Sequence, residues 1–170
     1  MAATLITTLG GASANSYVDL DEAETYADTR LDADAWDGAT APRRIRALLQ
    51  AARRLNDEHW VGDRVSATQA LAWPRYNVLV PDGAAAWCGG QYYDTTEIPL
   101  PVRQAQIELA IASLDGWTFD DGGDEAIVEE FEADGVRTKF GAANPRAGDL
   151  PATVARLLSG LLRGPEWVRG

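Results

Sequence analysis

The stretch PVRQAQIELAIASLDGW, from Pro101 to Trp117, decides the fold. Its apolar residues cover nearly the whole circumference of a helix, and Pro99 and Pro101 mark the start of that helix. A helix that is apolar on almost every side is stable only when other elements cover it. We therefore predict that it is the central element of a mainly helical protein.

A second strong helix is predicted upstream, from the start signal at Thr40 and Pro42 to about Trp60. Its apolar residues follow the i, i+3, i+4, i+7 spacing of one stripe: Ile45, Leu48, Leu49, Ala52 and Leu55. Arginines fill much of the remaining circumference: Arg43, Arg44, Arg46, Arg53 and Arg54. The pattern predicts a helix with one face in the core and a basic face beside it.

Two weaker helices flank this pair in the sequence. The first is predicted from about Asp19 to Arg30, where Asp19 caps the helix and Glu22 completes a capping box. The last is predicted from about Pro151 to Arg163, because its leucines have helical spacing and Gly164-Pro165 then ends the pattern. A short helix capped by Ser66 is a further expectation.

The rest of the chain predicts one hairpin and one long loop. Residues 127–140 carry β-branched and aromatic residues around Asp134-Gly135, a pair typical of tight hairpin turns. Residues 76–98 contain Pro81, three glycines and several aromatics without helical period. We predict a mainly α fold, a helical bundle of about four helices with a small β-hairpin and a long loop excursion. Residues 1–163 form one domain and residues 164–170 form a tail.

The formal charge of −11 is unevenly distributed along the 170 residues. Residues 1–42 hold eight acids against one base, and residues 76–170 hold fifteen acids against seven bases. Between them, residues 43–75 hold seven arginines against three acids. Since nucleic-acid affinity comes largely from cations that neutralise phosphates, strong DNA binding would have to come from this middle segment alone.

Composition also indicates the cellular compartment in which the protein is made. Cys88 is the only cysteine, so no disulfide can form within the chain, which fits synthesis in a reducing cytoplasm. No apolar run approaches the roughly 20 residues that are needed to cross a bilayer. Met1 to Gly11 lacks the basic region that opens a signal peptide. We expect a soluble protein that is not exported and does not contact a membrane.

Residues that carry most enzyme chemistry occur here without their usual partners. Lys139 is the only lysine and no phosphate-binding loop precedes it, while the segment around Ser13 lacks the second glycine of a nucleophile turn. His59 is the only histidine, and its place at a helix end favours capping or packing. Cys88 is expected to be partly buried, and the acids at 120–125 do not have calcium-loop spacing. We expect no enzyme, no metal and no cofactor.

The basic face of the second helix has three possible uses. Arginine forms bidentate contacts with carboxylates, and acidic segments lie on both sides of the arginine block. In a ring of identical subunits, a basic face on one copy and an acidic face on the next form a head-to-tail contact. Arg43, Arg46 and Arg53 are therefore candidate subunit-interface residues. Pairing within the chain and simple solvation are the alternatives.

Three sequence strings resemble a known group of phage proteins. They are ANSYV from Ala14 to Val18, WVGDR from Trp60 to Arg64, and QALAWPR from Gln69 to Arg75, which is the most specific. With Ile98-Pro99 before the apolar helix and the leucine-rich last helix, they match over most of the chain. Proteins of this group are often labelled DnaT-like single-stranded DNA-binding proteins, and they resemble the head-to-tail adaptors of long-tailed phages.

The resemblance implies a structural protein of the virion neck, made in the host cytoplasm and assembled as a ring of about twelve copies. Its partners would be the portal protein on one side and a stopper or tail-terminator protein on the other. The implied portal-docking residues are those of the tail: Pro165, Glu166, Trp167, Val168 and Arg169. DNA would pass through the channel without specific binding. The longer segment at 76–97 departs from the group's usual pattern.

Single-stranded DNA binding, as a replication accessory, is the alternative function. Such proteins offer a basic groove with exposed aromatics on which bases stack. Aromatics are available at Trp73, Tyr76, Trp87, Tyr92 and Tyr93. In the sequence, however, Arg75 is the only base beside them before Arg103. We therefore expect these aromatics to serve the core or an interface, with Trp73 and Pro74 as a structural anchor.

Overall fold

The computed structural model describes residues 3–81, 89–118, 131–133, 136–138 and 150–163. Within these ranges the elements in chain order are α1 (Leu20–Ala27), α2 (Asp34–Asp37), α3 (Ala41–Asn56), β1 (Asp63–Arg64), β2 (Arg75–Tyr76), α4 (Leu100–Leu114), β3 (Phe131–Ala133), β4 (Val136–Thr138) and α5 (Ala152–Leu157). The prediction of a mainly α fold with a small antiparallel strand pair is confirmed.

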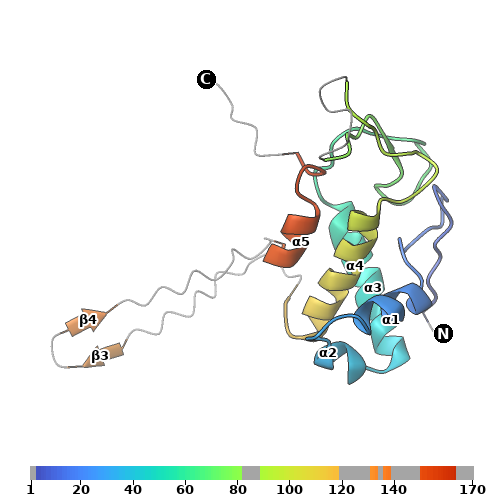
Figure 1. Cartoon of the computed structure of the whole chain (residues 1–170). Coiled ribbons are helices and arrows are strands. Elements are labelled where there is room, and N and C mark those ends of the chain that lie inside the picture. The colour runs from blue at the N-terminus through green and yellow to red at the C-terminus, as the bar shows by residue number, and fades with distance from the viewer. Residues whose placement is uncertain (1–2, 82–88, 119–130, 134–135, 139–149, 164–170) are drawn as a thin grey trace.

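Helix α4 is the central element, as its sequence predicts. It contacts α1, α2, α3 and α5, and Figure 1 shows it between α3 and α5. Its fully or almost fully buried apolar residues come from every side of the helix: Val102, Ala105, Ile107, Leu109, Ala110 and Ile111. Among the described helices, none combines the length and the apolar character that crossing a bilayer requires.

Helix α3 packs its predicted stripe against α4. Leu48 and Leu55 have no exposed surface, whereas Ile45 and Leu49 at the edges of the stripe are half-buried. The helix ends at Asn56, earlier than the predicted Trp60. One reason is local, because the Trp60 indole N–H donates to the Leu55 carbonyl at 2.8 Å and so satisfies an acceptor of the last turn.

Helix α1 begins as predicted. The Asp19 carboxylate accepts a hydrogen bond from the Glu22 backbone N–H at 2.8 Å, which satisfies a free donor of the first turn. The helix ends at Ala27 and not at Arg30. Arg30 instead reaches across to α4, where its guanidinium lies 3.1 Å from the buried carboxylate of Glu108.

Two predicted helices need correction. The last helix, α5, ends at Leu157 rather than Arg163, because Gly160 adopts a φ of +84° that no α-helix contains. No helix forms at Ser66, whose backbone N–H donates to the Gln69 side chain at 2.9 Å in a turn. The sequence also gave no sign of the short helix α2 or of strands β1 and β2.

Strands β1 and β2 form an antiparallel pair that depends on one glycine. Gly62 precedes β1 with a φ of +70°, and a Cβ atom there would lie 2.1 Å from the carbonyl oxygen of Tyr76. Only glycine permits this approach. The predicted hairpin pairs Phe131–Ala133 with Val136–Thr138, while its predicted turn at Asp134-Gly135 lies outside the described residues.

A buried glutamine in α4 ties three segments together. Gln106 has no exposed surface, and its Oε1 accepts from the Tyr17 backbone N–H at 2.8 Å. Its Nε2 donates to the Ser16 hydroxyl at 2.7 Å and to the Leu48 carbonyl at 2.9 Å. The amide therefore joins the segment before α1, helix α3 and helix α4.

We predict that Gln106→Leu destabilises the fold by about 2–4 kcal/mol, because the Tyr17 N–H and the Ser16 hydroxyl lose partners while buried. Urea denaturation measures the free energy of unfolding. Gln104→Leu, a partly exposed position on the same helix, is the matched control and is expected to change stability by no more than about 0.5 kcal/mol. Equal effects of the two substitutions would contradict this role for Gln106.

Candidate functional site

The arginines of α3 divide into two groups. Arg44 faces the protein, where its Nη1 pairs with Glu24 at 3.0 Å and its Nε donates to the Trp36 carbonyl at 2.9 Å. Arg54 pairs with Glu58 one turn on. Intrachain pairing, one of the three possible uses, thus accounts for these two arginines.

The three arginines nominated for a subunit interface form the second group. Arg43, Arg46 and Arg53 are exposed, and their spacing of three and seven residues places them on one face of α3. We call this set the arginine stripe. Arg46 donates to the Pro42 carbonyl of its own helix at 3.2 Å. Within the described ranges, none of the three pairs with an acid.

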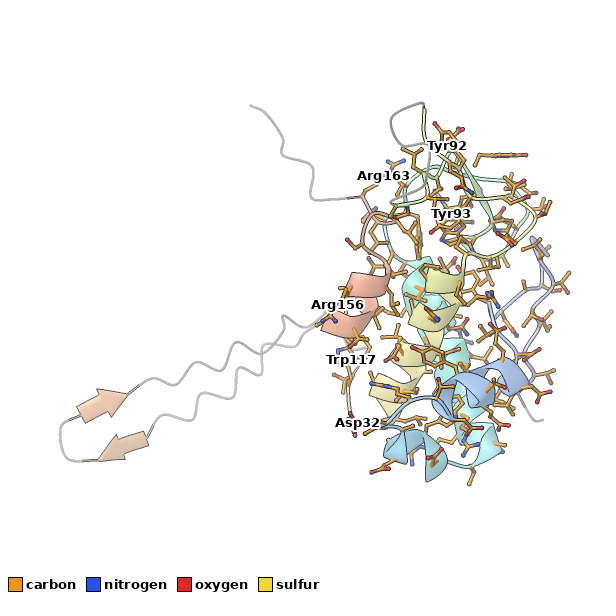
Figure 2. All side chains as sticks on the ribbon, viewed as in Figure 1. Asp32, Tyr92, Tyr93, Trp117, Arg156 and Arg163 are labelled. Atoms are coloured by element: carbon orange, nitrogen blue, oxygen red, sulfur yellow. The ribbon has the colours of Figure 1, made fainter. Side chains whose placement is uncertain are left out.

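An open groove of about 620 Å³ begins at the stripe. Helix α3 contributes Arg43, Arg46, Ala47 and Gln50, and the end of α4 and the residues after it contribute Ser113, Leu114, Trp117 and Thr118. Trp117 is half-buried and is labelled in Figure 2. The groove therefore has a cationic and amide wall with an aliphatic and aromatic floor.

An acidic surface lies on helix α2 and on the segment that joins α1 to it. Asp28, Asp32, Asp34 and Asp37 are all exposed, and across the described residues none forms an ion pair. Leu31, in the middle of this segment, is 98 % exposed. We call residues 28–37 the acidic segment. A single exposed leucine is common at protein surfaces, so the four unpaired carboxylates are what distinguishes this surface.

A second cationic cluster surrounds a recess of about 250 Å³ at the other end of α3. Arg64, Arg75 and Arg163 line it together with His59 and Glu58. We call it the arginine recess. His59 is expected from the sequence to cap the helix end or to pack, and its exposed side chain does not fit packing. Its backbone carbonyl accepts the Arg163 N–H at 2.7 Å. Figure 2 shows Arg163 far from Asp32.

The four described aromatics from Trp73 to Tyr93 take two roles, packing and exposure. Trp73 is 1 % exposed and makes edge-to-face contacts with Trp60 and Tyr93 at ring-centroid distances of 5.7 and 6.2 Å. Pro74 is buried beside it. Tyr76 and Tyr92 are about half exposed, at 47 % and 53 %. Trp87 lies outside the described residues.

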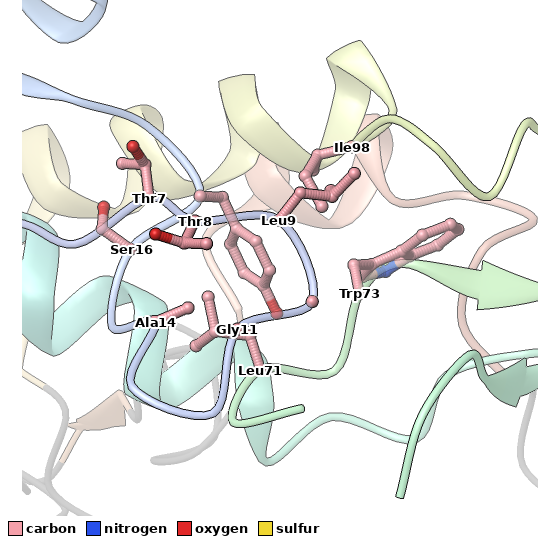
Figure 3. A pocket seen from close by; sticks show the side chains of 11 residues that line it. Thr7, Thr8, Leu9, Gly11, Ala14, Ser16, Leu71, Trp73 and Ile98 are labelled. Carbon is pink, nitrogen blue, oxygen red and sulfur yellow. The ribbon is translucent and has the colours of Figure 1, made fainter. Parts of the chain in front are cut away.

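The N-terminal loop encloses a cavity of only about 10 Å³, which has room for about one water molecule. Figure 3 shows the side chains around it, which come from residues 7–11, from Ala14, Ser16 and Tyr17, and from Leu71, Trp73 and Ile98. The space is a gap in the core and cannot hold a substrate. No group of three or more potential metal ligands occurs in the parts of the chain that the structure describes.

Several residues weighed in the sequence lie outside the described residues. They are Cys88, the acids at 120–125 and the portal-docking residues Pro165, Glu166, Trp167, Val168 and Arg169. The docking assignment stays a prediction.

Sequence reasoning missed the arginine recess. It counted Arg75 as the only base near the aromatics, but the fold brings Arg64 and Arg163 to the same recess. One signal was present, since Arg64 and Arg75 each end one of the strings WVGDR and QALAWPR. Nothing in the sequence connects either to Arg163.

The fold and its surfaces define a class: a small, mainly helical protein whose described part carries separate exposed basic and acidic surfaces. The chain belongs to the family described as "Putative DnaT-like ssDNA binding protein", which it matches over residues 1–169. This confirms the label of the group that the sequence strings resemble. Comparisons with curated proteins and with solved structures give no match.

Proposed function

We propose that this protein is a head-to-tail adaptor, a structural subunit that forms a ring between the portal and the stopper or tail of a phage. The observation that carries the proposal is the separation of unpaired charge on one subunit. The arginines of the stripe and the four aspartates of the acidic segment are exposed, and none of them forms an ion pair among the described residues.

Unpaired charges of opposite sign on separate surfaces suit a heterologous contact between copies. Each copy would offer its arginine stripe to the acidic segment of the next, and repetition closes a ring when the rotation fits. Arginine favours this pairing because its planar guanidinium binds a carboxylate through two parallel hydrogen bonds. The exposed Leu31 adds apolar area to such a contact, and the groove with Trp117 at its floor can receive an apolar side chain.

The remaining parts of the proposal concern the partners and the channel. The tail residues 165–169 would dock on the portal, with Trp167 as the anchor, because a tryptophan that fills a pocket is a frequent binding hot spot. Each subunit adds a formal charge of −11, so a ring repels the passing genome and suits a conduit. The protein would lie in the virion neck after synthesis in the host cytoplasm.

Charge reversal tests the contact between copies. We expect a stripe variant (Arg43→Glu, Arg46→Glu, Arg53→Glu) and a segment variant (Asp28→Lys, Asp32→Lys, Asp34→Lys) each to fold and each to fail to form rings on portal-bearing heads. In a mixture, the acidic stripe of one variant can meet the basic segment of the other, and the native arginine stripe of the second can meet the native acidic segment of the first. Every contact then joins opposite charges, provided that the two variants alternate in a ring with an even number of subunits. We therefore expect the mixture to assemble, as seen by electron microscopy of the particles. Assembly by the stripe variant alone would refute the contact.

Removing the tail tests the portal contact. We expect deletion of Glu166 to Gly170 to leave the helical circular-dichroism signal unchanged, while attachment to portal-bearing heads is lost in a pull-down. Trp167→Ala should reproduce most of this loss, because truncation of a hot-spot residue costs at least about 2 kcal/mol of binding energy. Retained attachment of the shortened chain would contradict the docking role of the tail.

Single-stranded DNA binding is the second candidate function, and the description of the family favours it over the adaptor. The structure adds support that the sequence lacked. Three arginines meet at the arginine recess, and exposed Tyr76 directly follows Arg75. Cations and exposed aromatics are the two components of single-strand binding surfaces.

Fluorescence anisotropy with a labelled single-stranded oligonucleotide at physiological salt separates the two candidates. A pure adaptor with a charge of −11 is expected to show no binding at micromolar protein concentration. Micromolar or tighter binding that weakens as salt rises would favour the replication accessory. Presence of the protein in mature virus particles, measured by mass spectrometry, would favour the adaptor.

A further inference from the structure

The arginine recess is built by three distant segments that backbone hydrogen bonds hold together. The Val61 N–H donates to the Leu161 carbonyl at 3.0 Å, and the Arg163 N–H donates to the His59 carbonyl at 2.7 Å. Strands β1 and β2 pair Arg64 with Arg75. Arg64, Arg75 and Arg163 are therefore brought to one place by the fold itself.

Arg75 is fixed at the floor of the recess. It is 9 % exposed, and its Nε, Nη1 and Nη2 donate to the carbonyls of Val61, Ala72 and Gly62 at 2.7, 3.1 and 2.6 Å. These bonds use three of the five N–H groups of a guanidinium and leave one on each Nη atom. Two donors of a rigid cation thus remain available to a ligand.

The positive charge of the recess is poorly balanced. Burial lowers the pKa of Arg75, and the nearby charges of Arg64 and Arg163 lower it further, while Asp63 opposes them. Glu58 is the one acid that lines the recess among the described residues, and it is paired with Arg54. Three cations that repel one another around an open space favour an anion between them.

We propose that the arginine recess binds a phosphate group, either as free phosphate or as a phosphodiester of a nucleic-acid strand. A single carboxylate would neutralise only one of three arginines and offers two oxygen atoms. Free phosphate offers more acceptor oxygens around a tetrahedral centre, which suits donors that converge from three segments. A phosphodiester has only one charge and two free oxygens, but successive phosphodiesters of one strand can reach more than one of the three arginines. The proposal goes beyond the adaptor function, because it requires neither ring assembly nor contact with the portal. Its phosphodiester form rests on the second candidate function, single-stranded DNA binding, whereas its free-phosphate form does not.

Thermal unfolding in sodium phosphate, compared with sodium chloride at equal ionic strength, tests the site. At a phosphate concentration ten times Kd we expect Tm to rise by about 3 °C. The variant Arg64→Gln with Arg163→Gln keeps Arg75 and its backbone bonds, and both replaced side chains are exposed. We expect it to bind phosphate at least about tenfold more weakly.

The matched control is Arg43→Gln with Arg46→Gln, which removes the same charge from the arginine stripe and should keep the full phosphate response. An unphosphorylated thymidine oligonucleotide then identifies the source. Oligonucleotide binding that the recess variant loses and the control keeps assigns the phosphodiester, whereas a response to phosphate alone assigns the free ion. The proposal is overturned if the wild-type protein responds to neither phosphate nor the oligonucleotide, if both variants respond equally, or if an acidic peptide binds and neither phosphate nor the oligonucleotide does.

Discussion

The buried amide of Gln106 is the constraint on which the rest of the structure depends. It hydrogen-bonds the Tyr17 N–H, the Ser16 hydroxyl and the Leu48 carbonyl, and it has no contact with water that could replace them. Apolar packing alone would allow α3 and α4 to slide or rotate against each other, since it is non-directional. Three directed bonds at one point fix their register and also fix where the chain enters α1.

Once that register is fixed, the surfaces follow. With Leu48 and Leu55 facing α4, the helical period turns Arg44 and Arg54 toward internal carboxylates and leaves Arg43, Arg46 and Arg53 facing outward. The same packing surrounds Glu108, a buried carboxylate of α4 that accepts from the Tyr26 hydroxyl at 2.8 Å and pairs with Arg30. Burial and Glu108 raise the pKa of Tyr26 to about 12, so this contact is neutral on the tyrosine side at physiological pH. The arginines that face the protein are therefore paired with carboxylates of the same chain, whereas those of the arginine stripe form no ion pair among the described residues.

The sequence predicted those parts of the fold that rest on periodic burial. Helices α3 and α4 and the Asp19 cap of α1 were found because a stripe, an apolar run and a capping box are local patterns. The role of Gln106 could not be found, since one polar residue in an apolar helix has no sign of its distant partners. The end of α5 was misplaced because leucine spacing continued past Gly160, whose backbone had left the helix. The arginine recess joins residues 64, 75 and 163, which only the tertiary structure relates.

A net charge of −11 does not by itself prevent an anion from binding at a local cationic site. At physiological ionic strength exposed charges are largely screened beyond about 8 Å. Arg43 and Asn56, which line the groove and the recess, lie thirteen residues apart on one helix, a rise of about 20 Å. The Arg43 end of the arginine stripe and the arginine recess thus respond to their own surroundings and not to the total charge, whereas Arg53 lies only three residues from Asn56. One subunit can therefore offer carboxylate partners a contact at one end of α3 and a phosphate group a different contact at the other.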